Sequence, residues 1–451
     1  MASPAAASFS RGARDAQAQL PHVVIFPFMA KSHTIPLTNL AHLLRRRQLA
    51  TVTFLTTPGN AAFVLAALSG ADGCVEALGS LSSLPAFVQA VSLLRPRFEE
   101  ALAAMRPPAS AVVADAFLHW AHAAAAALGV RTLAFFGANV FAHVIREVCL
   151  RDNPAAALTG GGSASAAAFA VPELPHVQLV LDDIPFPFNE PDQTVAASIR
   201  DMDGDLGRAI AGSRGLIVNT FDAMERRYIE HWNRHVGPRA WPVGPLCLAR
   251  PTTPVPRHGG APPPWMRWLD EKAAGCAAVL YVALGTLLRE VADGLEQSGV
   301  DFLRAVRPGF EDRVRGRGTV VREWVDQCAI LQHGGVKGFL SHCGISAGVP
   351  LAAWPIGAEQ PLNAKLVVDE LRVGIRVPVA KHDVTTGALG LVESEEIARR
   401  RVARELMTGE EGGEAARNVA ALGEKAREAM GEGGSSWRAV EEMIGGLGQP
   451  V

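Results

Sequence analysis

Two residues in the first half of the chain, His33 and Asp115, have the chemistry of an acid–base pair. His33 follows the apolar segment "HVVIFPF" at 22–28, and Asp115 lies near the end of "SAVVADAF" at 110–117. Both segments are typical of buried strands, and the carboxyl ends of parallel strands meet at one edge of a sheet. We therefore expect both side chains to face one cleft, where the carboxylate would orient the imidazole and stabilise its cation as it removes a proton from a hydroxyl. From the residues alone, a structural role for each stays open.

A second group of candidates lies between residues 324 and 360. Trp324 offers a flat surface on which a nucleobase could stack, and Gln327 could bond to a base edge or a sugar hydroxyl. His342 ends the apolar segment "GVKGFLSH", and a helix that began after the next glycine would hold a phosphate through its free backbone N–H groups. Glu359 and Gln360 could fix sugar hydroxyls. Taken singly, Trp324 also fits a core position, His342 a structural role, and the Glu-Gln pair the first turn of a helix.

The order and spacing of this second group resemble the signature box of the plant family 1 UDP-sugar-dependent glycosyltransferases. That box starts with W-x-x-Q, continues through I-L-x-H, G-x-F-x-x-H-C-G and G-V-P-x-x-x-W-P, and ends with an acid, Gln and, after two more residues, Asn. The resemblance extends over nearly the whole chain. The residues that match the box are Trp324, Gln327, Ile330, Leu331, His333, Gly338, Phe339, His342, Cys343, Gly344, Gly348, Val349, Pro350, Trp354, Pro355, Glu359, Gln360 and Asn363.

The resemblance implies a site for a UDP-sugar donor and a role for each matching residue. Trp324 would stack on uracil, Gln327 would bind the nucleoside, and His342 would contact the diphosphate. Glu359 and Gln360 would hold the sugar, and a final Gln is usual in the glucosyl transferases. The predicted donor site comprises Thr286, Trp324, Val325, Gln327, His342, Gly344, Glu359 and Gln360. No metal and no cofactor besides the donor substrate is expected.

In the first half of the chain, the resemblance makes His33 the catalytic base and Asp115 its partner. The deprotonated acceptor hydroxyl would attack the anomeric carbon opposite the UDP leaving group and so invert its configuration. The family usually has Gly before this His, whereas Ser32 stands here. The acceptor would be a small lipophilic molecule, bound by first-domain loops at about 60–110 and 140–200 that are rich in Ala and poor in distinctive polar groups.

Seven residues that the family has after its H-C-G have no counterpart here. The family continues with W-N-S-x-x-E-S, whereas Gly344 is followed directly by Ile345. The absent residues include the Asn and Ser that contact phosphate and the Glu that holds the ribose. A parallel crossover needs about a dozen residues, and little chain separates His342 from Pro350. We therefore expect the phosphate-binding helix to be lost and a flanking strand to be displaced or unpaired.

Strand and helix patterns alternate along the chain, which favours parallel βαβ units and an α/β fold. With the resemblance, this predicts two Rossmann-like domains facing across a cleft, the GT-B type of glycosyltransferase architecture. A Pro- and Gly-rich stretch marks the boundary between the domains. The predicted divisions are a disordered leader (1–20), an N-terminal acceptor-binding domain (21–245), a linker (246–264), a C-terminal UDP-sugar-binding domain (265–434) and a final segment that returns to the N-terminal domain (435–451).

Composition and charge exclude several other classes of protein. The 451 residues are 49% hydrophobic and 20% charged with a net charge of −2, so nothing favours a nucleic-acid or anionic-membrane partner. No apolar run is long enough to span a membrane, and the Ala/Ser-rich leader lacks the apolar core of a secretory signal. Six scattered cysteines without a C-x-x-C motif favour a reducing compartment. We expect a cytoplasmic monomer that binds a UDP-sugar and a small-molecule acceptor.

Two functions remain open at this stage. The first is the inverting transfer of a sugar, glucose by preference, from UDP to an acceptor hydroxyl, with activity impaired by the missing residues. The second is a catalytically inactive relative, a degenerate paralogue or truncated gene model without effective UDP-sugar binding. A nicotinamide dehydrogenase is disfavoured because "MAKSHTIP" after the first strand contains no G-x-G-x-x-G.

Overall fold

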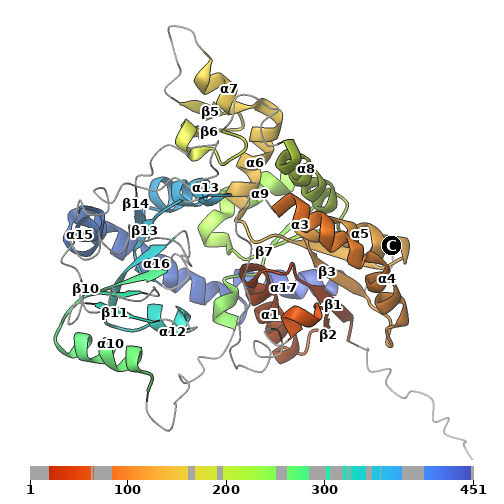
Figure 1. Cartoon of the computed structure of the whole chain (residues 1–451), viewed down its shortest axis with the longest axis horizontal. Coiled ribbons are helices and arrows are strands. Elements are labelled where there is room, and N and C mark those ends of the chain that lie inside the picture. The colour runs from red at the N-terminus through yellow and green to blue at the C-terminus, as the bar shows by residue number, and fades with distance from the viewer. Residues whose placement is uncertain are drawn as a thin grey trace, which may run out of the picture.

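The structure is a computed structural model. In the residues that it describes, the chain forms two parallel six-stranded sheets and a small β-hairpin (Figure 1). The described residues are 20–61, 64, 84–160, 168–189, 197–249, 262–283, 301–304, 318–321, 325, 327–341, 348–355, 357–377 and 401–447. The hairpin pairs β5 (Phe169–Val171) with β6 (Leu174–Leu179). The predicted α/β class with two Rossmann-like domains is confirmed.

The first sheet belongs to the N-terminal domain. Its strands, in spatial order, are β2 (Thr51–Phe54), β1 (His22–Phe26), β3 (Ala111–Asp115), β4 (Arg131–Phe135), β7 (Leu216–Val218) and β8 (Ala240–Pro242). Every residue of β1 and β3 is buried, as expected for central strands covered on both faces. The chain leaves β1 toward β2 on one side and returns to β3 on the other, so the strand order reverses between β1 and β3. Ligands of open α/β sheets bind at such a reversal, outside the carboxyl ends of the strands.

Helices cover both faces of this sheet, so its central strands β1 and β3 are buried throughout. Asn residues bound α6: Asn139 caps its N-terminus by accepting the Ala142 N–H at 2.7 Å, and Asn153 follows its end with a φ of 44°. The helices of this domain are α1 (Lys31–Arg46), α3 (Leu84–Val91), η2 (Ser92–Leu94), α4 (Arg95–Ala104), η3 (Ala116–Leu118), α5 (His119–Ala127), α6 (Val140–Asp152), α7 (Pro154–Thr159), η4 (Leu181–Asp183), α8 (Ala197–Ala211), α9 (Asp222–His235) and η5 (Leu246–Ala249).

The second sheet belongs to the C-terminal domain. Its strands, in spatial order, are β11 (Gly318–Val320), β10 (Asp301–Arg304), β9 (Val279–Ala283), β12 (Val336–Ser341), β13 (Leu351–Ala353) and β14 (Gly374–Arg376). The helices after the linker are α10 (Pro264–Ala274), α12 (Gln327–Leu331), α13 (Gln360–Lys365), η6 (Leu366–Glu370), α15 (Arg401–Thr408), α16 (Glu410–Met430) and α17 (Ser435–Gly445). No helix in the described parts of the chain has both the length and the apolar character needed to cross a membrane.

The expectation of a displaced or unpaired strand beside the short connection is wrong. β13 pairs in parallel with β12, from Phe339–Leu351 to Ser341–Ala353, and pairs with β14 on its other side. The reason is the shortness of β13. To return beside a three-residue strand the chain needs to travel back only about 10 Å, and a connection from 342 to 350 reaches up to about 30 Å when extended. Burial of the whole of β13 stabilises the pairing.

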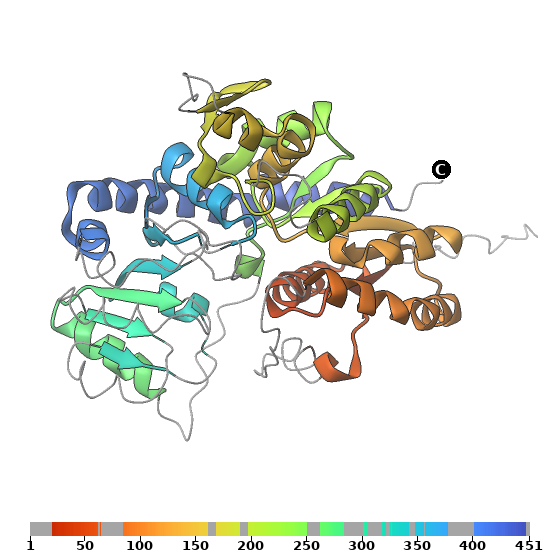
Figure 2. The same ribbon diagram turned by 45° about the horizontal axis from the view of Figure 1, so that its top comes forward.

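The ends of the domains are interleaved. The first part of the predicted linker is ordered as η5, and its Leu246 and Ala249 are buried in the core of the first sheet. After the second sheet, α16 contacts both β14 and α9, and α17 returns to β8 (Figure 2). Val440, Met443 and Ile444 of α17 are buried in the same core as η5. Residues from the last part of the chain therefore complete the hydrophobic core of the N-terminal domain.

Candidate active site

The structure brings His33 and Asp115 into direct contact. The His33 Nδ1 lies 2.7 Å from the Asp115 Oδ2, and the other carboxylate oxygen accepts the Phe117 N–H at 3.1 Å. Asp115 is fully buried, whereas the His33 side chain is 17% exposed. Because a carboxylate can only accept, Nδ1 carries the proton and Nε2 carries the lone pair. The imidazole is thus fixed in the tautomer that a general base needs.

His33 lies in the first turn of α1 rather than in an irregular loop. The helix begins early because the Thr34 N–H donates to the Ala30 carbonyl at 2.9 Å. Asp115 is the last residue of β3, and β1 and β3 are neighbours at the reversal of strand order. The contact therefore follows from two adjacent strand ends, each of which delivers one side chain to the same edge.

Electrostatic surroundings raise the pKa of His33 above its ordinary value. Burial by itself lowers this pKa, but the charge of Asp115 and its hydrogen bond outweigh burial, and the charge of Glu359 adds to them. A raised pKa makes the imidazole a stronger base. The charge that Glu359 contributes to this raised pKa comes from the C-terminal domain.

Aromatic side chains surround the imidazole. The ring of His33 lies edge-to-face against Phe28 at 5.6 Å and against Phe117 at 5.4 Å between centroids. Phe117 in turn packs on Phe136 at 5.5 Å. These phenylalanines were not predicted, although each stands one or two residues beyond a strand of the first sheet, where a strand-end search would have found them. Edge-to-face contacts between rings are stabilising, so these phenylalanines help to hold the imidazole in place.

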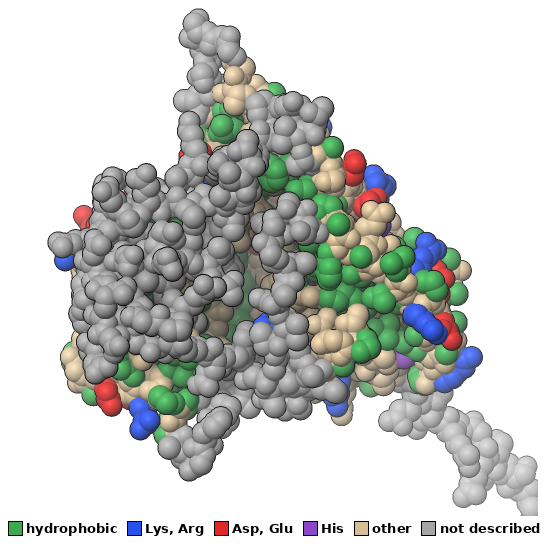
Figure 3. Space-filling view, viewed as in Figure 1, with side chains coloured by type: hydrophobic (Ala, Val, Ile, Leu, Met, Phe, Trp, Pro, Cys, Tyr) green, Lys and Arg blue, Asp and Glu red, His purple; other side chains and the backbone are tan. Residues whose placement is uncertain are grey.

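Helices that carry apolar side chains on their outer face lie next to the turn that follows Asp115. Both α3 and α8 contact η3, the turn that follows Asp115. Hydrophobic side chains gather over α3, α5 and α8 on the face seen in Figure 3. The neighbourhood of the His33–Asp115 pair is therefore apolar on the side of these helices.

Glu359 and Gln360 lie at the start of α13. The Gln360 Oε1 accepts the Gly357 N–H at 3.2 Å, and the Asn363 Nδ2 lies 3.5 Å from the Glu359 Oε1. Ala358, directly before the pair, has a φ of 51°, a left-handed conformation that residues with a Cβ rarely adopt. Glu359 and Gln360 are half-buried, so their polar atoms stay partly accessible to a ligand.

The rest of the predicted donor site is described only in part. Val325 is half-buried against the core of the second domain, and Gln327 is the exposed first residue of α12. Thr286, Trp324, His342 and Gly344 lie outside the described residues. The described geometry therefore bears on the catalytic pair and the sugar-holding pair, and not on the contacts expected for uracil and diphosphate.

Solved structures define the class of this architecture. A Glycyrrhiza uralensis UDP-glycosyltransferase complexed with glycyrrhetinic acid 3-O-monoglucuronide is 26% identical, with a TM-score of 0.78 over 95% of this chain and 96% of that one. A UDP-glucosyltransferase of Polygonum tinctorium in complex with 3,4-dichloroaniline is also 26% identical, with a TM-score of 0.75 over 96% of this chain and 100% of that one. The fold is that of the GT-B nucleotide-sugar transferases.

Sequence similarity gives the family. A family model described as UDP-glucoronosyl and UDP-glucosyl transferase matches residues 260–389. UDP-glycosyltransferase 90A1 of Arabidopsis thaliana is 37% identical over 474 positions, which cover 94% of this chain and 95% of that protein. UDP-glucose flavonoid 3-O-glucosyltransferase 7 of Fragaria ananassa is 31% identical over 94% of this chain and 96% of that protein. The chain belongs to the plant UDP-glycosyltransferase family, and the predicted resemblance is confirmed.

Proposed function

We propose that this protein transfers a sugar, glucose by preference, from a UDP-sugar to a hydroxyl of a small lipophilic acceptor with inversion at the anomeric carbon. The observation that carries the proposal is the 2.7 Å contact between the His33 Nδ1 and buried Asp115, which leaves Nε2 as the basic atom. Phe28 and Phe117 around the imidazole support an apolar acceptor. The relative named as a UDP-glucose flavonoid glucosyltransferase supports both the donor and the kind of acceptor.

In this mechanism each described residue has one task. His33 takes the acceptor's proton on Nε2, and Asp115 stabilises the imidazolium that forms. The acceptor oxygen then attacks the anomeric carbon from the face opposite UDP. Glu359 and Gln360 hold the sugar hydroxyls, and the predicted nucleotide contacts are Thr286, Trp324, Val325, Gln327, His342 and Gly344. The reaction needs no metal, because proton removal comes from His33 and the leaving group is held by the donor site.

Substitution of His33 tests the proposal. His33→Ala should abolish turnover while leaving the affinity for UDP nearly unchanged, because the imidazole contacts the acceptor and not the nucleotide. Formation of the sugar–acceptor product and calorimetric titration of UDP measure the two quantities. His235→Ala, at an exposed position of α9, is the matched control and should behave as the wild type. Turnover retained by His33→Ala would remove His33 as the base.

The shortness of the 342–350 connection favours a second candidate, an inactive relative without effective UDP-sugar binding. The match to the Arabidopsis relative spans 474 positions, more than the 451 residues of this chain, so some positions of the relative have no counterpart here. Calorimetric titration of UDP into the protein separates the candidates. Micromolar binding supports the transferase, whereas absence of binding in a protein that unfolds cooperatively supports the inactive relative. A variant with the seven family residues restored after Gly344 should then bind UDP far more tightly.

We propose a monomer in the cytoplasm as the working state. No disulfide joins any two cysteines of the described residues, which suits a reducing compartment. Light scattering on the purified protein measures its mass, and a fluorescent fusion reports the compartment. A dimeric mass or an organellar signal would each reject the corresponding statement.

A further inference from the structure

The helix that begins with the sugar-holding pair is packed against the other domain. Glu359 directly precedes α13, which belongs by sequence to the C-terminal domain. Yet Leu362 of this helix and Leu366 after it are fully buried in a hydrophobic cluster whose other buried members all lie between residues 116 and 240. α13 also contacts both α6 and η4 of the N-terminal domain. Its position is therefore set from across the domain boundary.

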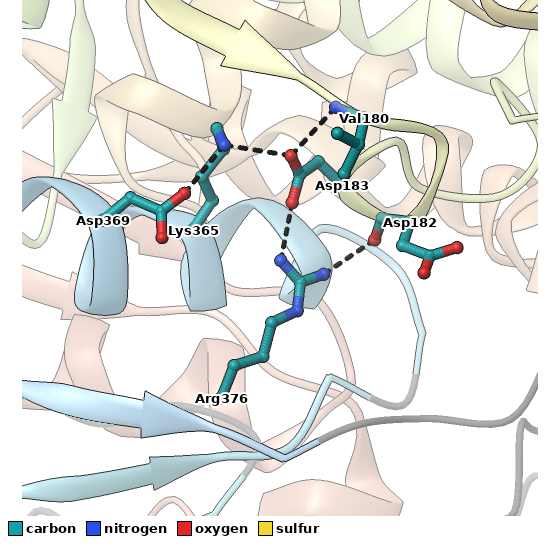
Figure 4. A network of polar contacts seen from close by, with 6 residues as sticks. All are labelled: Val180, Asp182, Asp183, Lys365, Asp369 and Arg376. Atoms are coloured by element: carbon teal, nitrogen blue, oxygen red, sulfur yellow. Dashed lines mark hydrogen bonds and ion pairs between the residues drawn. The ribbon is translucent and has the colours of Figure 1, made fainter. Parts of the chain in front are cut away.

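A buried carboxylate of the N-terminal domain binds two cations of the C-terminal domain. Asp183, at the end of η4, lies 3.0 Å from the Lys365 Nζ and 2.6 Å from the Arg376 guanidinium (Figure 4). Lys365 also binds Asp369 at 2.8 Å, and Arg376 donates to the Asp182 carbonyl at 2.7 Å. Asp183 further accepts the Val180 N–H at 3.1 Å, so the carboxylate is oriented by its own turn.

Burial makes this cluster stronger than a surface ion pair. The side chains of Asp183 and Lys365 are 2% and 9% exposed, so solvent screens their attraction little. Burial alone lowers the pKa of Lys365, but the bond to Asp369 and the charge of Asp183 raise it above its ordinary value, which keeps the amine charged. Removing one member of such a cluster leaves a buried charge without compensation, and this is strongly destabilising.

A second contact reaches Glu359 itself. The Asn139 Nδ2 donates to the Asn363 Oδ1 at 2.7 Å, and the Asn363 Nδ2 lies 3.5 Å from the Glu359 Oε1. Asn139 is fixed in turn because its Oδ1 caps α6. A chain of three side chains thus joins the N-terminus of α6 to the carboxylate proposed to hold the sugar.

We infer that Asp183 and Asn139, two residues of the acceptor-binding domain, are positioning residues for the donor sugar. Asp183 holds the end of α13 through Lys365 and the end of β14 through Arg376, and Asn139 holds the first turn of α13 through Asn363. Together they set the placement of Glu359 and Gln360. The sugar-holding part of this inference rests on the proposed function. Its consequence is that affinity for the sugar of the donor depends on a domain assigned to the acceptor.

Comparison of two ligands separates positioning from general damage. UDP lacks the sugar, so Asp183→Asn should weaken binding of UDP-glucose by roughly tenfold and leave binding of UDP within about twofold, as expected for a displaced contact. Asn139→Ala should show the same selectivity. Arg239→Gln is the matched control, because the Arg239–Glu442 pair also joins α17 to the N-terminal domain but is exposed on both sides. Equal losses of UDP and UDP-glucose would overturn the inference.

Hydrogen exchange gives a readout that needs no ligand. In the free protein, the amides of α13 and η6 should exchange several-fold faster in Asp183→Asn than in the wild type or Arg239→Gln, because local opening is easier. Arg376→Gln, at a side chain that is 25% exposed, is a milder variant should Asp183→Asn fail to fold. If the wild type binds no UDP, the proposed function fails. The exchange rates then still show whether Asp183 holds α13 against the N-terminal domain. Unchanged exchange in Asp183→Asn and Arg376→Gln would overturn the inference.

Discussion

His33 and Asp115 are brought together within one sheet, whereas Glu359 and Gln360 depend on contacts between two domains. Asp115 ends β3, and His33 lies in the first turn of α1, the helix that follows the neighbouring strand β1, so elements of one domain set their separation. The second pair begins a short helix that is held by Asp183 and Asn139 of the other domain. The comparison predicts that damage to the first pair stays local and damage to the second spreads.

The largest effect is expected from Asp115→Asn. The amide can still accept the Phe117 N–H, but its NH₂ would face His33 Nδ1 and force the proton onto Nε2, the wrong tautomer for a base. We expect kcat to fall by roughly 10³–10⁴-fold with little change in UDP affinity. Steady-state kinetics measures this loss of kcat. Asp222→Asn, which removes a carboxylate paired with Arg226 on the surface of α9, is the control. A loss below tenfold would contradict a base oriented by Asp115.

The next effect, on stability, should come from Asp183→Ala. It leaves Lys365 and Arg376 facing a buried site without their carboxylate, which should lower the free energy of unfolding by about 3–5 kcal/mol. Arg239→Ala, at an exposed pair, should cost less than about 1 kcal/mol. Urea denaturation of both variants checks the difference. Equal costs would show that the cluster at α13 behaves as a surface pair.

Glu225 sharpens the comparison because it is a buried carboxyl that accepts hydrogen bonds from its own domain, from the Thr220 hydroxyl and the Phe141 N–H. Burial raises its pKa to about 7 against hydrogen bonds from Thr220 and from the backbone of α6. Between pH 4.5 and 7 the unfolded chain ionises this group while the folded protein keeps it neutral, so stability falls as pH rises, by on the order of 3 kcal/mol. Glu225→Gln should remove this loss. In urea denaturation, the free energy of unfolding of Glu225→Gln relative to that of the wild type should therefore be higher at pH 8 than at pH 5. The same difference between the two proteins at both pH values would contradict the raised pKa of Glu225.

The smallest effect is expected from Glu359 of the C-terminal domain on the pKa of His33 in the N-terminal domain. The pKa of His33 is raised in part by the charge of Glu359, and a base loses activity as pH falls through its own pKa. In Glu359→Gln the acid limb of the kcat/KM profile should therefore shift to lower pH by a fraction of a unit, besides any loss of sugar affinity. Gln360→Ala, which changes no charge, should leave the limb in place. A limb that does not move would place Glu359 too far from the imidazole to act on it.

The two pairs also differ in how far sequence could predict them. His33 and Asp115 follow recognisable apolar strands, and the rule that parallel strand ends share an edge was sufficient to bring them together. Asn139–Asn363 and Asp183–Arg376 join positions 224 and 193 residues apart, in separate domains. Hydrophobic periodicity specifies the face of each element but not how two finished domains dock. For this reason the sequence predicted that α13 belongs to the C-terminal domain but did not predict its packing against the N-terminal domain.

At the short connection between β12 and β13, a general rule gave a prediction that was wrong. The general length of parallel crossovers predicted a displaced strand, whereas β13 is paired on both sides. The rule assumes a strand of ordinary length, and Leu351–Ala353 is too short to require a long return. The pairing of the strands therefore does not decide whether phosphate contacts are lost, and UDP binding is the measurement that addresses this second question.

The return of α17 to the first sheet has a consequence for the order of events during synthesis. Leu37 and Leu44 of α1 share their core with Met443 and Ile444 of α17, which leave the ribosome about 400 residues later, roughly 20–80 s at ordinary rates of translation. Until then the N-terminal domain has an open apolar seam along α1 and η5. The growing chain is therefore exposed to aggregation on this seam for most of its synthesis, and chaperones would be expected to bind it there. An N-terminal domain produced on its own would keep that seam open unless the segment of α17 were supplied with it.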